Sequence, residues 1–173
     1  MNKGNGSLRY MEMSDMDKVL EWRNSDRVRL NMTNDHVISR QEHVDWFRNL
    51  DRTKNHFLLF EYKRKPGGVV YFKDLNVDHN SCYWGFYLGD SSLPKGTGNL
   101  MGSMGLDFAF QKLGVRKICA EVFLFNDRSI KYHERLGFRR EGLLKQHYLK
   151  HNNYEDVICY ALFKEDWERT EPV

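Results

Sequence analysis

Residues 93–98 read LPKGTG and open an apolar stretch with helical spacing that covers residues 97–113. A strand-like run precedes them, so two closely spaced glycines, Gly96 and Gly98, stand between a strand and a helix. Glycines in such a turn allow the backbone to fold closely around an anion, and the helix start directs free N–H groups toward it. The charge of Lys95 adds to the attraction, and a diphosphate is the natural ligand. A plain strand-to-helix turn explains the two glycines equally well.

Other phosphate-binding motifs fit this stretch poorly. The Rossmann pattern requires a third glycine in G-x-G-x-x-G and a βαβ partner, and neither is present. A Walker loop requires Gly-Lys-Ser/Thr, which does not follow the glycines. The stretch therefore indicates an anion site outside these two classes.

A second group of polar residues follows the strand-like run that ends at Phe125. Asn126 stands at a predicted helix start, where its amide can cap the helix or reach a ligand. Ser129 is small and allows close approach one turn later, and Tyr132 follows nearly two turns after Asn126. A phenol in that place can donate a proton to a leaving thiolate. A helix cap followed by a core tyrosine is the competing interpretation.

Composition limits the class of protein. The chain has 173 residues, 40% of them hydrophobic, which suits one compact domain over residues 1–173. The net charge of +3 is mild and the charges are interleaved, so we expect no nucleic-acid partner. No apolar run approaches the roughly 20 residues that span a bilayer, and the polar N-terminus has no signal-peptide core. Three isolated cysteines without a CxxC pair predict buried thiols, no metal site and a cytoplasmic location.

The order of predicted elements is β-α-α-β-β-β-α-β-α-β-β, an α/β (α+β) protein with a mixed sheet. Short turns join the early strands, which should be antiparallel, and helices separate the later ones, where a parallel pair is expected. The expected strands are residues 8–13, 57–62, 69–77, 82–88, 117–125, 139–150 and 154–163, and the expected helices begin at Ser14, Ser39, Thr97 and Asn126.

Several local signals set these boundaries. Ser14 has the character of an N-cap, and Ser39 with Glu42 has the S-x-x-E spacing of a capping box. KPGG at residues 65–68 is typical of a turn between strands. The polar tail at residues 167–173 is expected to be poorly ordered.

Together, the two constellations resemble the acetyl-CoA site of the GNAT acetyltransferases, whose pattern is Q/R-x-x-G-x-G/A, then an N-x-x-A-x-x-x-Y-like spacing and a terminal GF. The resemblance implies a mostly antiparallel sheet, splayed into a V, of about seven strands flanked by about four helices. The pyrophosphate of acetyl-CoA would lie on the backbone of residues 95–99, and Tyr132 would protonate the departing sulfur. Leu93 departs from the pattern, where the family has Gln or Arg. The implied acetyl-CoA contacts are Leu88, Lys95, Gly96, Thr97, Gly98, Asn99, Asn126, Ser129 and Tyr132.

Further segments resemble bacterial GNAT enzymes of the pseudaminic acid pathway, which act on UDP-4-amino-4,6-dideoxy-N-acetyl-β-L-altrosamine. They are EWRN at residues 21–24, Met32, HVDWF at residues 43–47, YWGFY at residues 83–87 and LPKGTGNLM at residues 93–101. By this resemblance, Arg23 and His43 would contact the uridine diphosphate. The sugar would be walled by Met32, Trp46, Tyr83 and Tyr87. Guanidinium suits phosphate, and the apolar face of a deoxy sugar suits aromatic rings and methionine.

Other interpretations stay open. EWRN-like segments also occur in GNATs that acetylate ribosomal proteins or polyamines, although cationic acceptors call for an acidic site. This chain instead carries Arg23, Arg27, Arg29 and Lys73 in the candidate loops. Arg27 and Arg29 fit solvated surface residues, Trp46 fits a core residue on a helix face, and His43 fits a surface residue on a helix. A CoA-binding regulatory module without turnover is opposed by the intact Tyr132.

The general base is not identified by the sequence. No glutamate lies in residues 82–88, where many GNATs keep one, which leaves Glu121, His43 or a water molecule. The oxyanion is expected on a backbone N–H near Leu88. A homodimer is compatible with the sequence.

Overall fold

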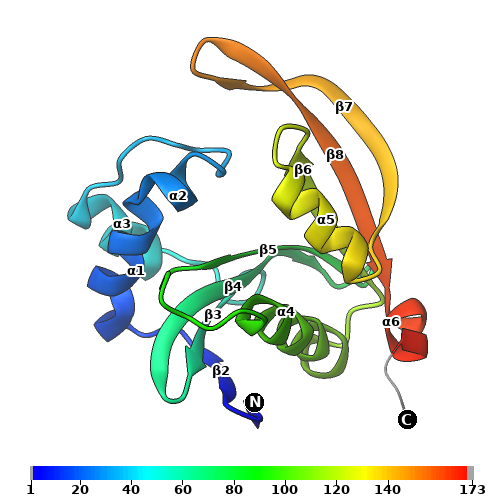
Figure 1. Ribbon diagram of the computed structural model, residues 1–173, viewed down its shortest axis with the longest axis horizontal. Coiled ribbons are helices and arrows are strands. Elements are labelled where there is room, and N and C mark those ends of the chain that lie inside the picture. The colour runs from blue at the N-terminus through cyan, green and yellow to red at the C-terminus, as the bar shows by residue number, and fades with distance from the viewer. Residues whose placement is uncertain (1, 171–173) are drawn as a thin grey trace.

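The computed structural model describes residues 2–170 and contains an eight-stranded sheet with helices on both faces (Figure 1). The strand order is β1-β2-β3-β4-β5-β6-β8-β7. The strands are β1 Asn2–Lys3, β2 Gly6–Tyr10, β3 His56–Tyr62, β4 Lys65–Asn76, β5 Ser81–Leu88, β6 Lys117–Phe123, β7 Arg139–Lys150 and β8 Asn153–Phe163. The helices are η1 Met13–Asp15, α1 Met16–Asn24, α2 Asp26–Arg29, α3 Arg40–Arg48, α4 Thr97–Asp107, η2 Phe108–Leu113, α5 Asp127–Arg135 and α6 Lys164–Thr170.

The sheet splits between β5 and β6, which form its parallel pair. These strands pair over only three positions, the last of which joins Tyr83 to Cys119. Beyond that point β5 stays with β4 as far as Leu88, while β6 stays with β8 as far as Phe123. The predicted mixed sheet, mostly antiparallel and splayed into a V, is therefore confirmed.

Helices cover the two faces with different cores. Alternate β5 residues, such as Trp84, pack with Met101 and Met104 of α4 and Ile130 of α5. The residues between them face the other side, where Tyr87 packs against the cluster of α1 and α3. Figure 1 shows α1–α3 on the left and α5 on the right, with the β7–β8 hairpin arching above them. The sheet therefore separates two chemically distinct sides, each beside the splayed end of β5.

Two predicted boundaries in the N-terminal half are wrong. β2 ends at Tyr10 because a 3-10 turn begins at Met13, and Glu12 with Asp15, not Ser14, forms the capping box at its start. The predicted turn at residues 65–68 lies inside β4, and the chain reverses at Lys63 and Arg64, both with positive φ.

Gly68 suits a strand here because a Cβ at this position would stand 2.6 Å from the Tyr87 carbonyl oxygen. A glycine is therefore required at this position by the close approach of β4 to β5, and not by a turn.

Other boundaries are confirmed. Ser39 caps α3 by accepting from the Glu42 N–H, although the Glu42 carboxylate bonds to His36 and not to the cap. The helix predicted at residues 97–113 is α4 continued by the π-helical turn η2, and it ends at Gly114 with φ 69°.

The C-terminal tail differs from the prediction. Residues up to Thr170 form α6, and residues 171–173 lie outside the described part. Trp167 is buried and its indole N–H donates to Asp107 at 3.0 Å, which anchors α6 to α4. Across residues 2–170, no helix has both the length and the apolar character that crossing a membrane requires.

Candidate active site

The turn before α4 presents its backbone openly. Gly96 is the N-cap with φ 91°, a left-handed conformation that favours glycine, and nothing lies within 4 Å of a Cβ built on it. A Cβ on Gly98 would meet only a methyl group of Leu88, at 3.5 Å. The Thr97 hydroxyl donates to the Pro94 carbonyl and so fixes the turn. The predicted anion-binding backbone is thus exposed and shaped by its own residues, with Lys95 and Asn99 also exposed beside it.

The Leu88 backbone points toward the opening of the sheet. Leu88 is paired with Gly68 on β4, and the next N–H, of Gly89, donates to the Gly67 carbonyl at 2.8 Å. In an antiparallel ladder this pattern makes Leu88 and Gly68 a non-hydrogen-bonded pair, so the Leu88 N–H faces away from β4. Because β6 has already left β5, this edge offers a free donor, as the oxyanion role requires.

Tyr132 reaches from α5 onto the first turn of α4. Its hydroxyl donates to the Gly98 carbonyl at 2.5 Å, and its ring packs on Phe86 with centroids 4.8 Å apart. A Cβ on Gly102 would stand 2.0 Å from the Tyr132 hydroxyl oxygen, so this glycine makes the room for the phenol. Burial raises the pKa of Tyr132 well above its usual range, which keeps the phenol protonated.

Asn126 uses both ends of its amide. The oxygen accepts from the Ser129 N–H at 3.0 Å and caps α5, and the nitrogen donates to the Asn31 side chain at 2.9 Å. Asn31 belongs to the loop between α2 and α3, on the other side of the opening. Asn126 therefore links the two sides of the splayed sheet.

These groups fit acetyl-CoA as a co-substrate. The open turn at Gly96 and Gly98 suits a diphosphate, and both a Leu88 methyl group and the Tyr132 hydroxyl lie beside Gly98. Residues 95–99 would hold the pyrophosphate by backbone N–H groups, and the thioester would lie along the free edge of β5.

Three predicted acceptor residues meet on the α1–α3 side. Arg23 donates to the Asn34 carbonyl, while its second terminal nitrogen, Nη1, is buried without a hydrogen-bond partner. Burial lowers the pKa of Arg23, an effect that the neighbouring hydroxyls of Tyr87 and Tyr71 oppose. His43, whose pKa is lowered by burial and then by the charge of Arg23, completes the group.

His43 is 5% exposed and serves partly as a packing residue. Its ring stacks on Trp46 at 5.3 Å, and Trp46 in turn packs edge-on against Phe57 at 4.8 Å. The ring bonds to the Met16 backbone, and Nδ1 has no partner. Trp46 thus lies behind His43 and supports it.

Met32 and Tyr83 lie apart from this group. The Met32 carbonyl accepts from Lys150 of the β7–β8 hairpin at 2.7 Å, which fixes the loop that carries Met32. Tyr83 is 43% exposed and pairs with Cys119 at the last position that joins β5 and β6, the apex of the V. Glu121 follows on the same face and accepts from the Tyr148 hydroxyl at 2.9 Å.

The acceptor side also contains residues that the sequence did not predict there. The expectation that Arg29 is solvated is wrong. Its side chain is only 20% exposed and donates to the Asp35 carbonyl at 2.7 Å. Arg27 is exposed, as expected, and donates to the Gly89 carbonyl at 2.5 Å. Tyr71 lies across Gly85, where a Cβ would stand 2.2 Å from the phenol. The glycine within the aromatic run of residues 83–87 was the available signal for such a close approach.

Comparison with known proteins adds the family. Residues 8–159 match the model of the acetyltransferase (GNAT) domain. The chain is 30% identical over 121 residues to the SPbeta prophage-derived uncharacterized N-acetyltransferase YokL of Bacillus subtilis, covering 69% of this chain and 67% of that protein. It is 28% identical over 124 residues to the acetyltransferase PseH of Campylobacter jejuni, covering 69% and 74%.

A solved structure shows the same fold. Spermidine N-acetyltransferase from Vibrio cholerae, in complex with CoA and spermine, superposes with a TM-score of 0.88 at 20% identity. The match covers 95% of this chain and 98% of that one. At this identity the likeness concerns the fold alone.

Proposed function

The chain belongs to the GNAT acetyltransferase family and is an acetyl-CoA-dependent N-acetyltransferase, and on that premise we propose that its acceptor is a nucleotide-linked amino sugar. The reaction is transfer of acetyl to the 4-amino group of a UDP-linked 4-amino-4,6-dideoxy sugar. The similarity to PseH, together with the predicted contacts of Arg23, His43 and Tyr87, supports this acceptor.

The buried, unpartnered Nη1 of the half-buried Arg23 is the observation that carries the choice of acceptor. A buried N–H without a partner costs about 1–3 kcal/mol, more when the group is charged, so a shift of Arg23 onto a ligand oxygen is favourable. A phosphate oxygen does so with a charge-assisted bond. A polyamine brings only further positive charge to this place, and Coulomb repulsion disfavours it.

Direct attack in a ternary complex suits the geometry. The acceptor nitrogen bonds to the acetyl carbon and the carbon–sulfur bond breaks, while the Leu88 N–H stabilises the charge on the carbonyl oxygen. Tyr132, held protonated by burial, turns from Gly98 and gives its proton to the leaving sulfur. The proton of the amine goes to Glu121 or to water, because Glu121 is on the acceptor face of β6.

The experiment is a thiol-release assay with acetyl-CoA and a panel of amines. The panel contains UDP-4-amino-4,6-dideoxy sugars of L-altro and D-gluco configuration, spermidine, an aminoglycoside and a ribosomal N-terminal peptide. Rapid release with a nucleotide sugar alone is the expected result. Release only with spermidine or the peptide would overturn the acceptor while leaving the acetyltransferase chemistry intact.

Substitution of Arg23 tests the carrying observation. Arg23→Ala should raise the KM for the nucleotide sugar by about tenfold or more, as for a lost bond to a charged group of roughly 1.5–3 kcal/mol. The KM for acetyl-CoA should hardly change. Arg48→Ala, on the exposed end of α3, is the matched control. Equal effects on both substrates would contradict the assignment.

A further inference from the structure

One tyrosine on β4 reaches the rim of the opening in the sheet. Tyr71 is paired with Gly85 of β5, and its side chain lies on the α1–α3 side. A Cβ at Gly85 would overlap both the ring and the hydroxyl of Tyr71, so the phenol extends over β5. Beyond Tyr83, β5 is no longer paired with β6 and forms one rim of the opening. The Tyr71 hydroxyl therefore lies at this rim.

The hydroxyl of Tyr71 is available to a ligand. Within residues 2–170 it makes no hydrogen bond, and it is not among the buried polar atoms that lack a partner, so it is open to solvent. Burial raises the pKa of Tyr71, an effect that the charge of Arg23 opposes, and the phenol stays protonated. Its oxygen therefore has a lone pair that can accept a hydrogen bond from an N–H group.

Packing fixes the direction of this phenol. The Tyr71 ring stacks on Phe57 of β3, with ring centroids 5.3 Å apart and an interplanar angle of 22°. Phe57 is in turn packed edge-on against Trp46 of α3. A hydroxyl on a ring that is already fixed loses little freedom when it bonds to a substrate, which is the condition for orienting a nucleophile.

Glu121 lies across the opening from the Tyr71 hydroxyl. The parallel strands β5 and β6 last pair at Tyr83 and Cys119. Two residues further along each strand, Gly85 and Glu121 occupy corresponding positions on the same face of the sheet. Burial raises the pKa of Tyr83, and the Cys119 thiol and the Glu121 carboxylate raise it further, so Glu121 is close to this part of β5.

The Glu121 carboxylate is held through one oxygen. The Tyr148 hydroxyl donates to Oε2 at 2.9 Å, and the Tyr148 ring packs against Phe123 with centroids 5.8 Å apart. No group within the described part of the chain bonds to Oε1. A carboxylate anchored in this way can accept a proton on its second oxygen. The two rims of the opening thus carry a phenol hydroxyl and a proton acceptor.

The proton donor Tyr132 approaches the same part of β5 from the other face. Its ring packs on Phe86, the residue after Gly85, with centroids 4.8 Å apart. Successive residues of a strand face opposite sides, so Tyr71 and Tyr132 flank the edge of β5 along which the thioester would lie. An amine that enters from the α1–α3 side meets the acetyl carbon between Tyr71 and Glu121.

We propose that the Tyr71 hydroxyl holds the acceptor amine at the edge of β5, opposite Glu121, and orients the nitrogen lone pair toward the acetyl carbon. The Tyr71 oxygen accepts a hydrogen bond from one N–H of the neutral amine. The nitrogen bonds to the acetyl carbon, the carbon–sulfur bond breaks and the sulfur takes the proton of Tyr132. The other amine proton passes to Oε1 of Glu121, and Tyr71 keeps its own proton. The inference rests on the proposed function for direct attack by an amine, whichever amine that is.

Tyr71→Phe tests this role because it removes the hydroxyl and keeps the ring on Phe57 and over Gly85. Thiol release is measured with acetyl-CoA and each amine of the panel that the native chain acetylates. We expect kcat to fall about tenfold, the effect of a nucleophile that is no longer oriented, while the KM for acetyl-CoA and the Tm stay the same. Tyr62→Phe, at the partly buried end of β3, is the matched control and should keep the native kcat.

A double variant shows whether the two residues act on the same nitrogen. Glu121→Gln preserves the shape of an exposed side chain and should lower kcat by about 100-fold, in the range of general base catalysis. Residues that act on one group are not additive, so adding Tyr71→Phe should cost little more. Losses that multiply to about 1000-fold would mean that the two residues act independently and would overturn the proposal.

The outcomes separate this inference from the proposed function. If only spermidine or the peptide is acetylated and Tyr71→Phe slows that reaction, the proposed acceptor is wrong and the role of Tyr71 stands. If Tyr71→Phe acetylates the nucleotide sugar at the native kcat, the inference is overturned and the proposed function stands. A lowered Tm or a raised KM for acetyl-CoA with an unchanged kcat would show a structural role alone and would also overturn the inference.

Discussion

The two sides of the splayed sheet are built by different means. On the α4–α5 side, the backbone supplies the contacts: the turn at Gly96, the free N–H of Leu88 and the helix start capped by Asn126. On the α1–α3 side, long cationic side chains converge from separate segments and keep unpartnered nitrogens. The first side suits a co-substrate that every family member shares, and the second suits an acceptor that only one group of enzymes uses. Co-substrate binding is thus left mainly to the backbone, and acceptor choice to side chains.

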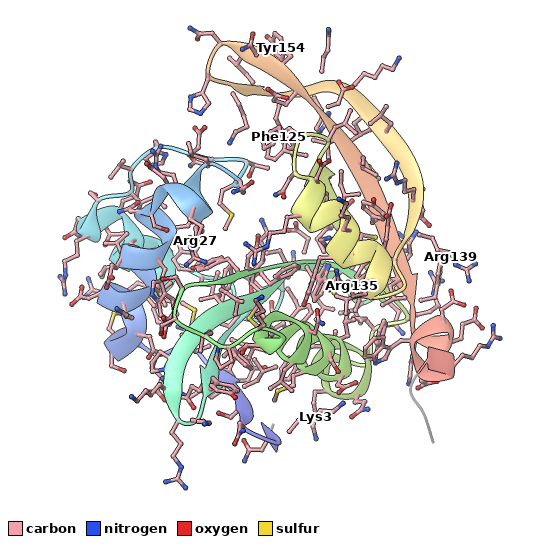
Figure 2. All side chains as sticks on the ribbon, in the orientation of Figure 1. Lys3, Arg27, Phe125, Arg135, Arg139 and Tyr154 are labelled. Atoms are coloured by element: carbon pink, nitrogen blue, oxygen red, sulfur yellow. The ribbon has the colours of Figure 1, made fainter. Side chains whose placement is uncertain are left out.

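The largest expected effect is the loss of the proton donor on the α4–α5 side. Tyr132→Phe removes the hydroxyl and should lower kcat by about 100-fold or more, in the range of general acid catalysis, with little change in either KM. Thiol release at saturating substrates measures it. Tyr154→Phe is the matched control, since Figure 2 shows Tyr154 near the outer end of the β7–β8 hairpin. An unchanged kcat in Tyr132→Phe would contradict the assignment of the proton donor to the α4–α5 side.

Acid should unfold the α4–α5 side through a buried histidine. His133 is 4% exposed, and burial lowers its pKa to about 4. Below pH 6.5 the His133 ring binds a proton in the unfolded chain but not in the folded chain. The free energy of unfolding therefore falls by about 3 kcal/mol as the pH drops toward 4. Urea unfolding at several pH values measures this slope. His133→Phe should flatten it, and an identical slope in both proteins would contradict the assignment.

Gly102 tests whether the position of Tyr132, and not only its hydroxyl, matters. Gly102→Ala places a methyl group 2.0 Å from the phenol oxygen and should lower kcat by roughly 10- to 100-fold, as for a displaced catalytic group. The acceptor KM should stay constant. In the Tyr132→Phe background, which lacks that oxygen, the same change should cost little more.

Gly105→Ala is the control on the same helix. Its added Cβ would stand 2.9 Å from a methyl group of Val70, so it tightens the core without touching Tyr132. Equal losses of kcat in both variants would mean that packing, not positioning, is responsible.

The smallest expected effect belongs to the tether on the α1–α3 side. Lys150→Met removes the ammonium group, and with it the hydrogen bond to the Met32 carbonyl, the ion pair with Asp35 and the contact of the charge with the Phe123 ring, so the loop should loosen. We expect the acceptor KM to rise about tenfold, the size of effect that follows the loss of a charged contact, while the KM for acetyl-CoA stays the same. Steady-state kinetics with Lys145→Met, on the exposed part of β7, as control measures the difference. A rise in both KM values would show that the sides are not independent.

The sequence predicts the residues of the α4–α5 side better than those of the α1–α3 side. The glycine turn, the Asn126 cap and the position of Tyr132 follow from spacing within a few turns of one helix, and such local signals predict where each group lies. The role of Arg29 depends on how the α2–α3 loop folds, and Lys150 bonds a residue 118 positions away. No local pattern encodes such a contact, which is why Arg29 was expected in solvent.

Strand boundaries failed for a related reason. The glycines at positions 67 and 68 have the composition of a turn, yet they lie in β4 because Gly68 must approach the backbone of Tyr87. The contact between β4 and β5, and not the local composition, therefore determines that these glycines lie in a strand and not in a turn.

The tie between Lys150 and the Met32 carbonyl also has a consequence in time. Met32 is synthesised early, whereas Lys150 is added 118 residues later. The turn before α4 and the helix that carries Tyr132 are complete well before that moment. The loop that carries Met32 can therefore be fixed only after the turn before α4 and the helix that carries Tyr132 have been synthesised.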